Sequence, residues 1–194
     1  MKKMMAITAW LLLVASSAFA ANDLQAGAKA FSIGFGDSAL NNLASPADAS
    51  QTPPPVNIGG RYFIERDVAI LAGFGFQTNG SDLSGTYFSI MFGARKYLRT
   101  EDFAPFLGVQ FSYLSYDATV KINGANTKYA DFTAYELAGM FGAEYFFAKQ
   151  FSVEGSIGLG LGRMSSDFVN GQRAQGDTTY LGTKNLGVKA NFYF

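Results

Sequence analysis

The chain has 194 residues, with 15 basic and 15 acidic side chains, no histidine and no cysteine. This length fits one domain, and the neutral charge balance gives no reason to expect a nucleic-acid partner. The missing histidine and cysteine exclude Ser-His and Asp-His catalysis and the usual zinc sites. We therefore expect no enzyme activity, no catalytic or metal-binding residue and no cofactor.

Residues 1–20 have the three parts of a secretory signal peptide. Lys2 and Lys3 supply positive charge, Ile7–Ala15 is mostly apolar, and Ala18-Phe19-Ala20 has the small-x-small pattern of a cleavage site. The apolar run falls short of the roughly 20 residues that a membrane-spanning helix needs. We expect cleavage after Ala20, with Ala18 and Ala20 forming the site, and a single β-barrel domain over residues 21–194.

Eight stretches of the remaining chain alternate between apolar and small or polar residues, a period typical of β-strands. Short connections at 66–67, 99–103 and 148–150 alternate with longer ones rich in Asn, Asp, Ser, Gly and Pro, which we predict to be loops. The predicted strands cover about 27–36, 56–65, 68–78, 85–98, 104–116, 132–147, 151–164 and 179–194. The predicted loops are Asp37–Pro55, Asn79–Ser84, Asp117–Asp131 and Ser166–Thr178.

The two faces of these strands differ in a way that favours a membrane barrel. One face is aliphatic and aromatic, whereas glycine and charged residues such as Arg95 and Glu144 share the other face. A soluble surface would carry more charge and less glycine. Hydrocarbon cannot hydrogen-bond a free sheet edge, so the sheet must close. We predict an all-β fold, a closed eight-stranded antiparallel transmembrane up-and-down β-barrel. The alternative is a soluble lipocalin-like barrel with its apolar face inward.

The polar residues on the glycine-bearing face are predicted to line and plug the lumen. Buried charges need partners, so we expect these side chains to pair with one another. The predicted lumen network is Arg61, Glu65, Arg95, Gln110, Glu136, Glu144, Glu154, Lys189 and Asn191.

Two of these carboxylates are predicted to face each other. If the turn at 148–150 pairs Phe147 with Phe151, Glu144 falls directly opposite Glu154. Like charges in that position destabilise a sheet, so a cation should lie between or above them. Arg95 and Lys189 are the candidates, since both lie in the half nearer the short turns.

Aromatic residues gather toward the ends of the predicted strands. In membrane barrels such residues form girdles at the two interfaces, whereas β-propensity alone also enriches aromatics in strands. The residues predicted for the girdles are Tyr62, Tyr87, Tyr97, Tyr113, Tyr145, Phe146, Phe147, Tyr180 and Tyr193.

The final residues end on phenylalanine with apolar side chains at alternate positions. Val188, Ala190, Phe192 and Phe194 resemble the C-terminal assembly signal of outer-membrane β-barrel proteins. With the eight strands, residues 21–194 resemble the small OmpX/OmpA-transmembrane-type barrels and, more broadly, the outer membrane β-barrel domain family. The resemblance implies a bacterial outer-membrane location and two partners: membrane lipid, and the barrel-assembly machinery that reads the C-terminal Phe.

The expected function is a non-enzymatic structural or cell-surface interaction role. Loops on a rigid scaffold often carry recognition, so an extracellular partner would contact Asp37–Pro55, Asp117–Asp131 and Ser166–Thr178. These segments are explained equally well as loops that only connect the strands and bind no partner. The alternative function is a narrow channel for ions or small solutes.

Overall fold

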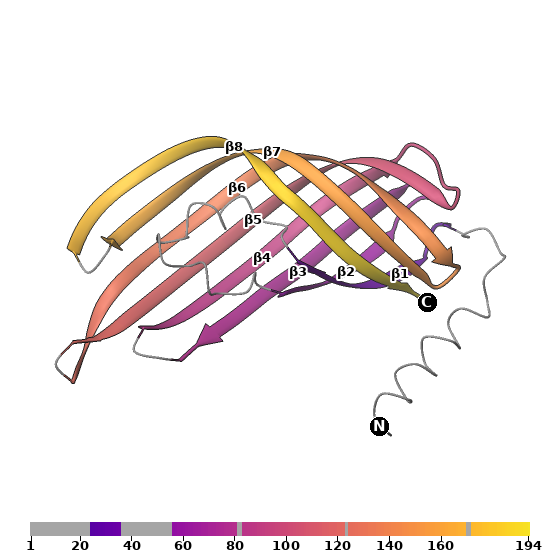
Figure 1. The fold of residues 1–194 in the computed structure, drawn as a ribbon. Coiled ribbons are helices and arrows are strands. Elements are labelled where there is room, and N and C mark those ends of the chain that lie inside the picture. Colours follow the sequence, from indigo (N-terminus) through magenta and orange to yellow (C-terminus); the bar gives the residue numbers. More distant parts are fainter. Residues whose placement is uncertain (1–23, 36–55, 81–82, 123, 170–171) are drawn as a thin grey trace, which may run out of the picture.

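The computed structural model describes residues 24–35, 56–80, 83–122, 124–169 and 172–194. Its strands form a closed antiparallel barrel in which neighbours in sequence pair and the last strand pairs with the first (Figure 1). The predicted eight-stranded up-and-down barrel is confirmed. The strands are β1 (Lys29–Phe35), β2 (Val56–Phe63), β3 (Val68–Asn79), β4 (Leu83–Tyr97), β5 (Phe103–Ile122), β6 (Ala125–Ala148), β7 (Phe151–Val169) and β8 (Gln172–Tyr193).

Two parts of the sequence prediction lie outside the described residues. They are the signal peptide over residues 1–20, with its cleavage residues Ala18 and Ala20, and the first predicted loop, Asp37–Pro55. In the part of the chain that the structure describes, no helix is long and apolar enough to cross a membrane.

The alternation of side chains turns the apolar face of the sheet outward. Phe92 and Leu159 are 54% and 55% exposed, whereas Arg95 and Glu144 are 4% and 0% exposed. Successive side chains of a strand point to opposite faces, so one orientation fixes the whole sheet. The lipocalin-like alternative, with the apolar face inward, is therefore wrong. Other exposed side chains of this outer apolar face are Phe31, Ile70, Phe74, Leu107, Val109, Phe111, Leu137, Phe141, Ile157, Leu161 and Phe192.

Two of the predicted loops are largely strand. β5 continues to Ile122 and β6 begins at Ala125, with Gly124 at a φ of 83° in the turn between them. β7 likewise continues to Val169 and β8 begins at Gln172, inside the predicted loop Ser166–Thr178. Beyond an apolar belt, both faces of a strand meet water, so its sequence turns polar without ceasing to pair. The two hairpins consequently extend at the end of the barrel opposite the short turns (Figure 1).

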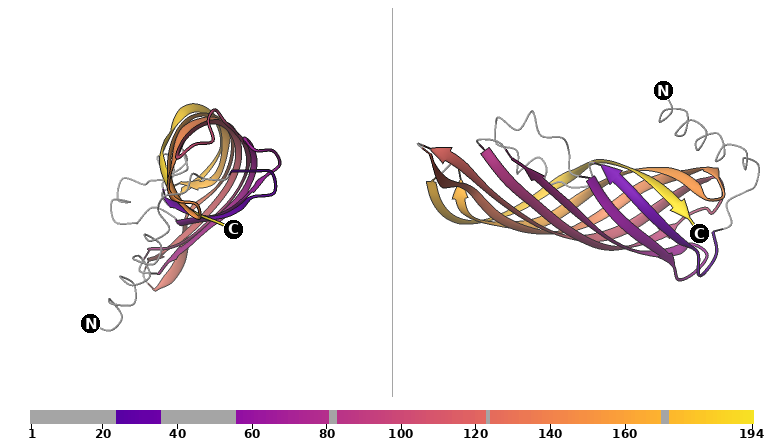
Figure 2. Two further views of the ribbon diagram at one scale, coloured as in Figure 1. Left: turned by 90° about the vertical axis from the view of Figure 1, so that its right-hand side faces the viewer. Right: turned by 90° about the horizontal axis from the view of Figure 1, so that it is seen from below.

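The short turns lie at the same end as the C-terminus, and the strands close into a ring when viewed along the barrel (Figures 1 and 2). At the β6–β7 turn the predicted pairing of Phe147 with Phe151 is wrong, because Ala148 pairs with Phe151 and a bulge shifts the register. The bulge lies close to the turn, between Phe146 and Ala148. Glu144 and Glu154 therefore still face each other, as the sequence predicted.

Several aromatic residues predicted for the interfacial girdles point into the barrel instead. Tyr97 lies two residues after the inward Arg95, and Tyr193 lies two residues after the inward Asn191, so each shares the inner face. Tyr87 and Phe146 are buried by the same parity. At the strand ends, the inner face needs large side chains to fill the tube, and aromatics fill it.

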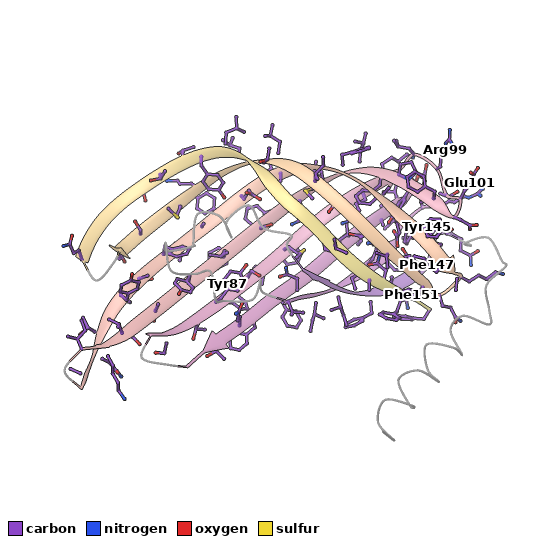
Figure 3. All side chains as sticks on the ribbon, in the orientation of Figure 1. Tyr87, Arg99, Glu101, Tyr145, Phe147 and Phe151 are labelled. Carbon is purple, nitrogen blue, oxygen red and sulfur yellow. The ribbon has the colours of Figure 1, made fainter. Side chains whose placement is uncertain are left out.

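Tyr62, Tyr145 and Phe147 do lie on the outer surface. Figure 3 shows Tyr145, Phe147 and Phe151 together near the short-turn end, close to Arg99 and Glu101. The rings of Tyr145 and Phe147 meet edge to face with centroids 4.9 Å apart. Tyr145, Phe147 and Phe151 form an aromatic rim at this end of the outer face, which is the position of an interfacial girdle.

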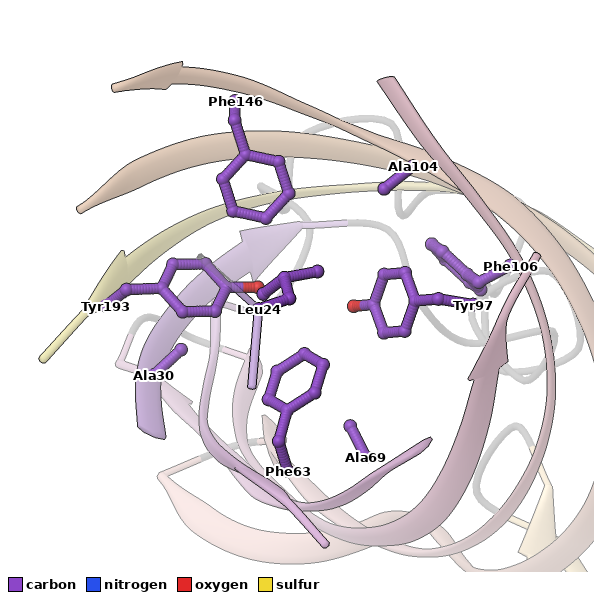
Figure 4. Packing of buried hydrophobic residues seen from close by; sticks show 9 residues of the cluster. All are labelled: Leu24, Ala30, Phe63, Ala69, Tyr97, Ala104, Phe106, Phe146 and Tyr193. Carbon is purple, nitrogen blue, oxygen red and sulfur yellow. The ribbon is translucent and has the colours of Figure 1, made fainter. Parts of the chain in front are cut away.

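Inside the barrel, apolar side chains form one cluster near the short turns and another toward the long hairpins. The rings of Tyr97 and Phe63 lie 5.4 Å apart and those of Tyr97 and Phe106 lie 5.6 Å apart. The second cluster contains Tyr87, Leu114, Phe132 and Ala134. The first, shown in Figure 4, contains Leu24, Ala30, Phe63, Ala69, Tyr97, Ala104, Phe106, Phe146 and Tyr193.

Candidate functional site

The charged side chains of the inner face meet across the lumen, beside the first apolar cluster. Pairing between strands places Glu144 of β6 beside Glu154 of β7, and Glu154 beside Lys189 of β8. Arg61 of β2 and Arg95 of β4 reach these residues from the facing wall. All five side chains are buried.

Arg61 lies between the two carboxylates. Its Nη1 donates to Glu144 Oε2 at 2.6 Å, and its Nη2 donates to Glu154 Oε2 at 2.5 Å. The sequence placed Arg61 in the lumen but named Arg95 and Lys189 as the candidates for this position. Which residues meet across the lumen depends on the stagger and closure of the barrel, and alternation along single strands does not determine either.

The two named candidates both lie near Glu154. Arg95 makes a bidentate pair with this carboxylate, with Nη1 donating to Oε2 at 2.6 Å and Nη2 donating to Oε1 at 2.9 Å. Lys189 Nζ lies 4.0 Å from Glu154 Oε1. The Arg95 guanidinium also stacks over the ring of Phe106, 4.2 Å from its centroid. Glu154 therefore interacts with three cations.

Neutral donors complete the surroundings of Glu144. Tyr97 donates to Oε2 at 2.7 Å, and Tyr193 donates to Oε1 at 2.7 Å. Ser152 donates to Oε1 as well, and Asn191 Nδ2 does so at 2.9 Å. Figure 4 shows the hydroxyls of Tyr97 and Tyr193 directed toward each other from opposite walls. We call Arg61, Arg95, Glu144, Glu154 and Lys189, with Tyr97, Tyr193, Ser152 and Asn191, the lumen network.

The sequence prediction included Asn191 but missed the other neutral members. Each of these residues lies two positions from an inward residue on its own strand, so alternation in the sequence already predicts that it points inward. The pairs are Tyr97 with Arg95, Ser152 with Glu154, and Tyr193 with Asn191. Ser32, whose Oγ donates to Asn191 Oδ1 at 2.7 Å, was missed for the same reason.

Three predicted members lie apart from this arrangement. Glu65 is exposed in the β2–β3 turn, so its predicted lumen position is wrong; β2 ends at Phe63, and strand parity no longer applies beyond that point. Gln110 is buried and its Nε2 donates to Ser112 Oγ at 3.1 Å. Glu136 is buried against Gly160 and accepts a hydrogen bond from Tyr180 at 3.3 Å.

Glycines of the inner face provide the room for these long side chains. A Cβ at Gly34 would lie 2.4 Å from Lys189 Cγ, and a Cβ at Gly142 would lie 2.5 Å from Phe106 Cζ. These distances are too short for any side chain, so the glycines are required by close packing. The glycine content of the chain thus serves a narrow, filled barrel.

The lumen network contains charges and hydroxyls, and no histidine or cysteine occurs in the sequence to make a nucleophile–base pair. Its chemistry is that of buried ions paired with one another. Taking one partner from a buried ion pair typically costs about 3–5 kcal/mol, because the other charge is left unpaired. The network therefore favours one arrangement of β2, β4, β6, β7 and β8.

The side chains of the outer face indicate whether lipid or water surrounds the barrel. On β6, exposed apolar or aromatic side chains run from Tyr135 to Phe147, and the charged Asp131 and Lys149 lie beyond the two ends. A closed sheet with an apolar outer band leaves no backbone group unpaired in hydrocarbon.

Residues 6–194 match the family described as the outer membrane protein beta-barrel domain. The chain belongs to this family. As an outer membrane protein beta-barrel domain, it is located in the bacterial outer membrane.

Solved structures of other outer-membrane proteins have a similar fold. The N-terminal β-barrel domain of Pseudomonas aeruginosa OprF is 12% identical, with 90% of this chain and 100% of that chain covered and a TM-score of 0.45. Yersinia pestis Ail in a phospholipid bilayer nanodisc is 15% identical, with coverages of 87% and 99% and a TM-score of 0.47. A major outer membrane protein from Thermus thermophilus is 13% identical, with coverages of 88% and 100% and a TM-score of 0.48. No curated protein matches the sequence.

Proposed function

We propose that this protein is a non-enzymatic cell-surface interaction barrel whose long hairpins bind an extended segment of an extracellular protein. The observation that carries the proposal is the unequal length of the strands. β1 and β2 have 7 and 8 residues, whereas β6 and β8 have 24 and 22. A tilted strand needs roughly 9–11 residues to span a bilayer. The long strands therefore continue well past the membrane on the outer side.

The edge of β8 is the part of this projection suited to binding a strand. β1 pairs with β8 only between Val188 and Tyr193. Within the described ranges, no strand pairs with that edge of β8 from Gln172 to Gly187. An unpaired edge presents a row of backbone N–H and C=O groups. A peptide in an extended conformation can hydrogen-bond to this row as an additional strand, a mode of binding called β-augmentation.

The projecting hairpins carry exposed ion pairs of both charges beside exposed apolar residues such as Leu181. Lys128 Nζ contacts Asp131 at 2.5 Å and Asp117 at 3.1 Å, and these hydrogen bonds raise the Lys128 pKa. Arg163 pairs with Asp177, and this hydrogen bond lowers the pKa of the aspartate. Exposed pairs of this kind select and orient a partner more than they add affinity. We infer that main-chain pairing provides the affinity.

We assign the lumen network a structural role, as a plug that fixes the barrel. The interior of an eight-stranded barrel is just wide enough for side chains to fill it. The side chains of Arg61, Glu144 and Glu154 meet from opposite walls, and the first apolar cluster lies beside them. This arrangement favours filling over the alternative role of a narrow channel for ions or small solutes.

We also propose that the barrel-assembly machinery reads the C-terminal residues. Val188, Phe192 and Phe194 are exposed on the outer face, and Ala190 is half-buried on the same face. In this arrangement, the assembly signal stays accessible while β8 pairs. Replacing Phe194 by Ser should lower the yield of folded barrel in the outer membrane without changing the stability of the fraction that folds.

The surface-interaction proposal is tested by binding of the nanodisc-held protein to an array of immobilised unstructured peptides. One variant replaces residues 166–176 by Asn-Gly, which joins Ser165 to its partner Asp177 and removes the tip of the β7–β8 hairpin. A control variant shortens the β5–β6 hairpin and leaves β8 intact. The first variant shortens the unpaired edge of β8 from residues 172–187 to residues 177–187, so we expect it to bind peptide more weakly than the wild type, whereas the control should bind as the wild type does. Equal binding by all three proteins, or none by the wild type, would contradict the proposal.

A further inference from the structure

A small cavity lies inside the barrel against β2 and β3. Its volume is about 20 Å³, and Ser32, Asn57, Arg61, Met91 and Lys189 are among the residues that line it. Gly59 also lines this space and contributes no side chain to fill it. A cavity of roughly 10–15 Å³ on this measure suffices for one water molecule. The cavity therefore has room for one particle of about this size.

Arg61, which lines the cavity, carries a buried hydrogen-bond donor without an acceptor. Both terminal nitrogens of Arg61 donate to carboxylates, but among the described side chains its Nε has no hydrogen-bond partner. The side chain is 0% exposed, so bulk water does not reach it. Buried donors are nearly always satisfied, and an orphan indicates a missing partner.

The charges of the lumen network point to the nature of that partner. Among the described residues of the lumen network, three cations, Arg61, Arg95 and Lys189, face two carboxylates, Glu144 and Glu154, which is one positive charge in excess. Both oxygens of Glu154 already accept hydrogen bonds from arginines. An uncompensated charge in a buried site is strongly unfavourable. Arg61 and Lys189 both border the cavity, so two of the three cations lie around one small space.

We propose that the cavity binds one monovalent anion of the size of chloride, held between the Arg61 Nε–H and the Lys189 ammonium. The anion accepts the orphan hydrogen bond and neutralises the excess charge. A water molecule would accept the bond but leave the charge, and the surrounding cations repel a metal ion. Sulfate and phosphate are too large for about 20 Å³. The anion is thus a structural constituent of the lumen network.

Halide substitution in crystals of the folded barrel tests the site directly. Crystals grown with bromide in place of chloride should show an anomalous peak between Arg61 and Lys189. Water in that position without an anomalous signal would overturn the proposal. This measurement uses the wild-type chain and does not depend on whether any variant folds.

A second test uses solution stability. Thermal unfolding in detergent is followed in sodium chloride and in sodium gluconate at equal ionic strength. We expect a saturable upward shift of the midpoint in chloride for the wild type and for Lys96→Met, whose cation lies on the outside beside Asp67. Lys189→Met should abolish the shift. Equal midpoints of the wild type in both salts, or an unchanged shift in Lys189→Met, would contradict a bound anion.

Discussion

Glu144 and Glu154 lie directly opposite each other on β6 and β7, and the guanidinium of Arg61 contacts both carboxylates from the facing wall. Two adjacent carboxylates repel each other in a sheet, and the cation from β2 offsets this repulsion because it contacts both. The lumen network thereby links strands that are far apart in sequence. The next two predictions follow from this relationship.

Replacing Arg61 by Met should strongly destabilise the barrel, because two buried carboxylates lose their shared partner. We expect a loss of about 3–5 kcal/mol in the free energy of unfolding, measured by urea titration in detergent. Lys96→Met is the matched control, since its ion pair with Asp67 is exposed to solvent and adds little to stability. Adding Glu144→Gln to Arg61→Met should recover part of the loss. Equal stability of Arg61→Met and the control would disprove the role of Arg61.

The filled lumen predicts that the wild-type protein does not conduct steadily in planar bilayers. The narrow interior of an eight-stranded barrel is occupied by side chains at the level of the lumen network. Arg95→Ala removes a side chain that contacts both Glu154 and the ring of Phe106, so we expect it to admit brief openings. Steady conductance of the wild type that changes in Glu144→Gln would show an ion pathway instead of a plug.

Gly142 and Gly139 offer a matched pair on one strand. A Cβ at Gly142 would meet Phe106 Cζ and the Gly155 carbonyl oxygen, each at 2.5 Å, whereas a Cβ at Gly139 would meet nothing within 4 Å. Gly142→Ala should therefore cost about 1–3 kcal/mol, the usual range for overpacking. Gly139→Ala should leave the free energy of unfolding unchanged or slightly raised. The urea midpoints of the two variants decide this, and a similar loss in both would refute the packing argument.

Because of the turn residue Asp67, we expect the stability of the barrel to depend weakly on pH in the acidic range. Its pKa is lowered, chiefly by the hydrogen bond from Lys96. A carboxyl with a depressed folded-state pKa stabilises the protein above its unfolded pKa of about 4 and loses that contribution as pH falls through the folded value. Asp67→Asn should thus lower the unfolding midpoint slightly at neutral pH, and this difference should shrink as pH falls from the unfolded pKa through the lowered folded one. A midpoint difference that grows on acidification would contradict this sign.

Much of the fold was predictable because strand alternation repeats at every position of the sheet. The outward direction of Phe92 and the inward direction of Glu144 both follow from period two together with the glycine-rich inner face. The pairing of Glu144 with Glu154 followed from a short turn, despite the bulge near Ala148. Local sequence fixes such relations between neighbouring strands.

Relations across the lumen were not predictable in the same way. Arg61 reaches Glu144 because closure and stagger bring β2 opposite β6, and neither strand encodes that distance in its own pattern. The girdle prediction for Tyr97 failed because aromatic residues suit both an interface and a narrow interior. The loop prediction for Asp117–Asp131 failed because polar residues are common in strands that project into water.

Site-directed labelling tests the central claim, the outward apolar face and the inward charged face, most directly. The chain has no cysteine, so single cysteines can be introduced at Leu159, which is exposed, and at Ser152, which is 0% exposed. In folded protein in bilayers, we predict that a lipid-soluble maleimide labels Leu159→Cys and that no maleimide labels Ser152→Cys until denaturation. Labelling of folded Ser152→Cys by a water-soluble maleimide, with Leu159→Cys protected until denaturation, would contradict the account.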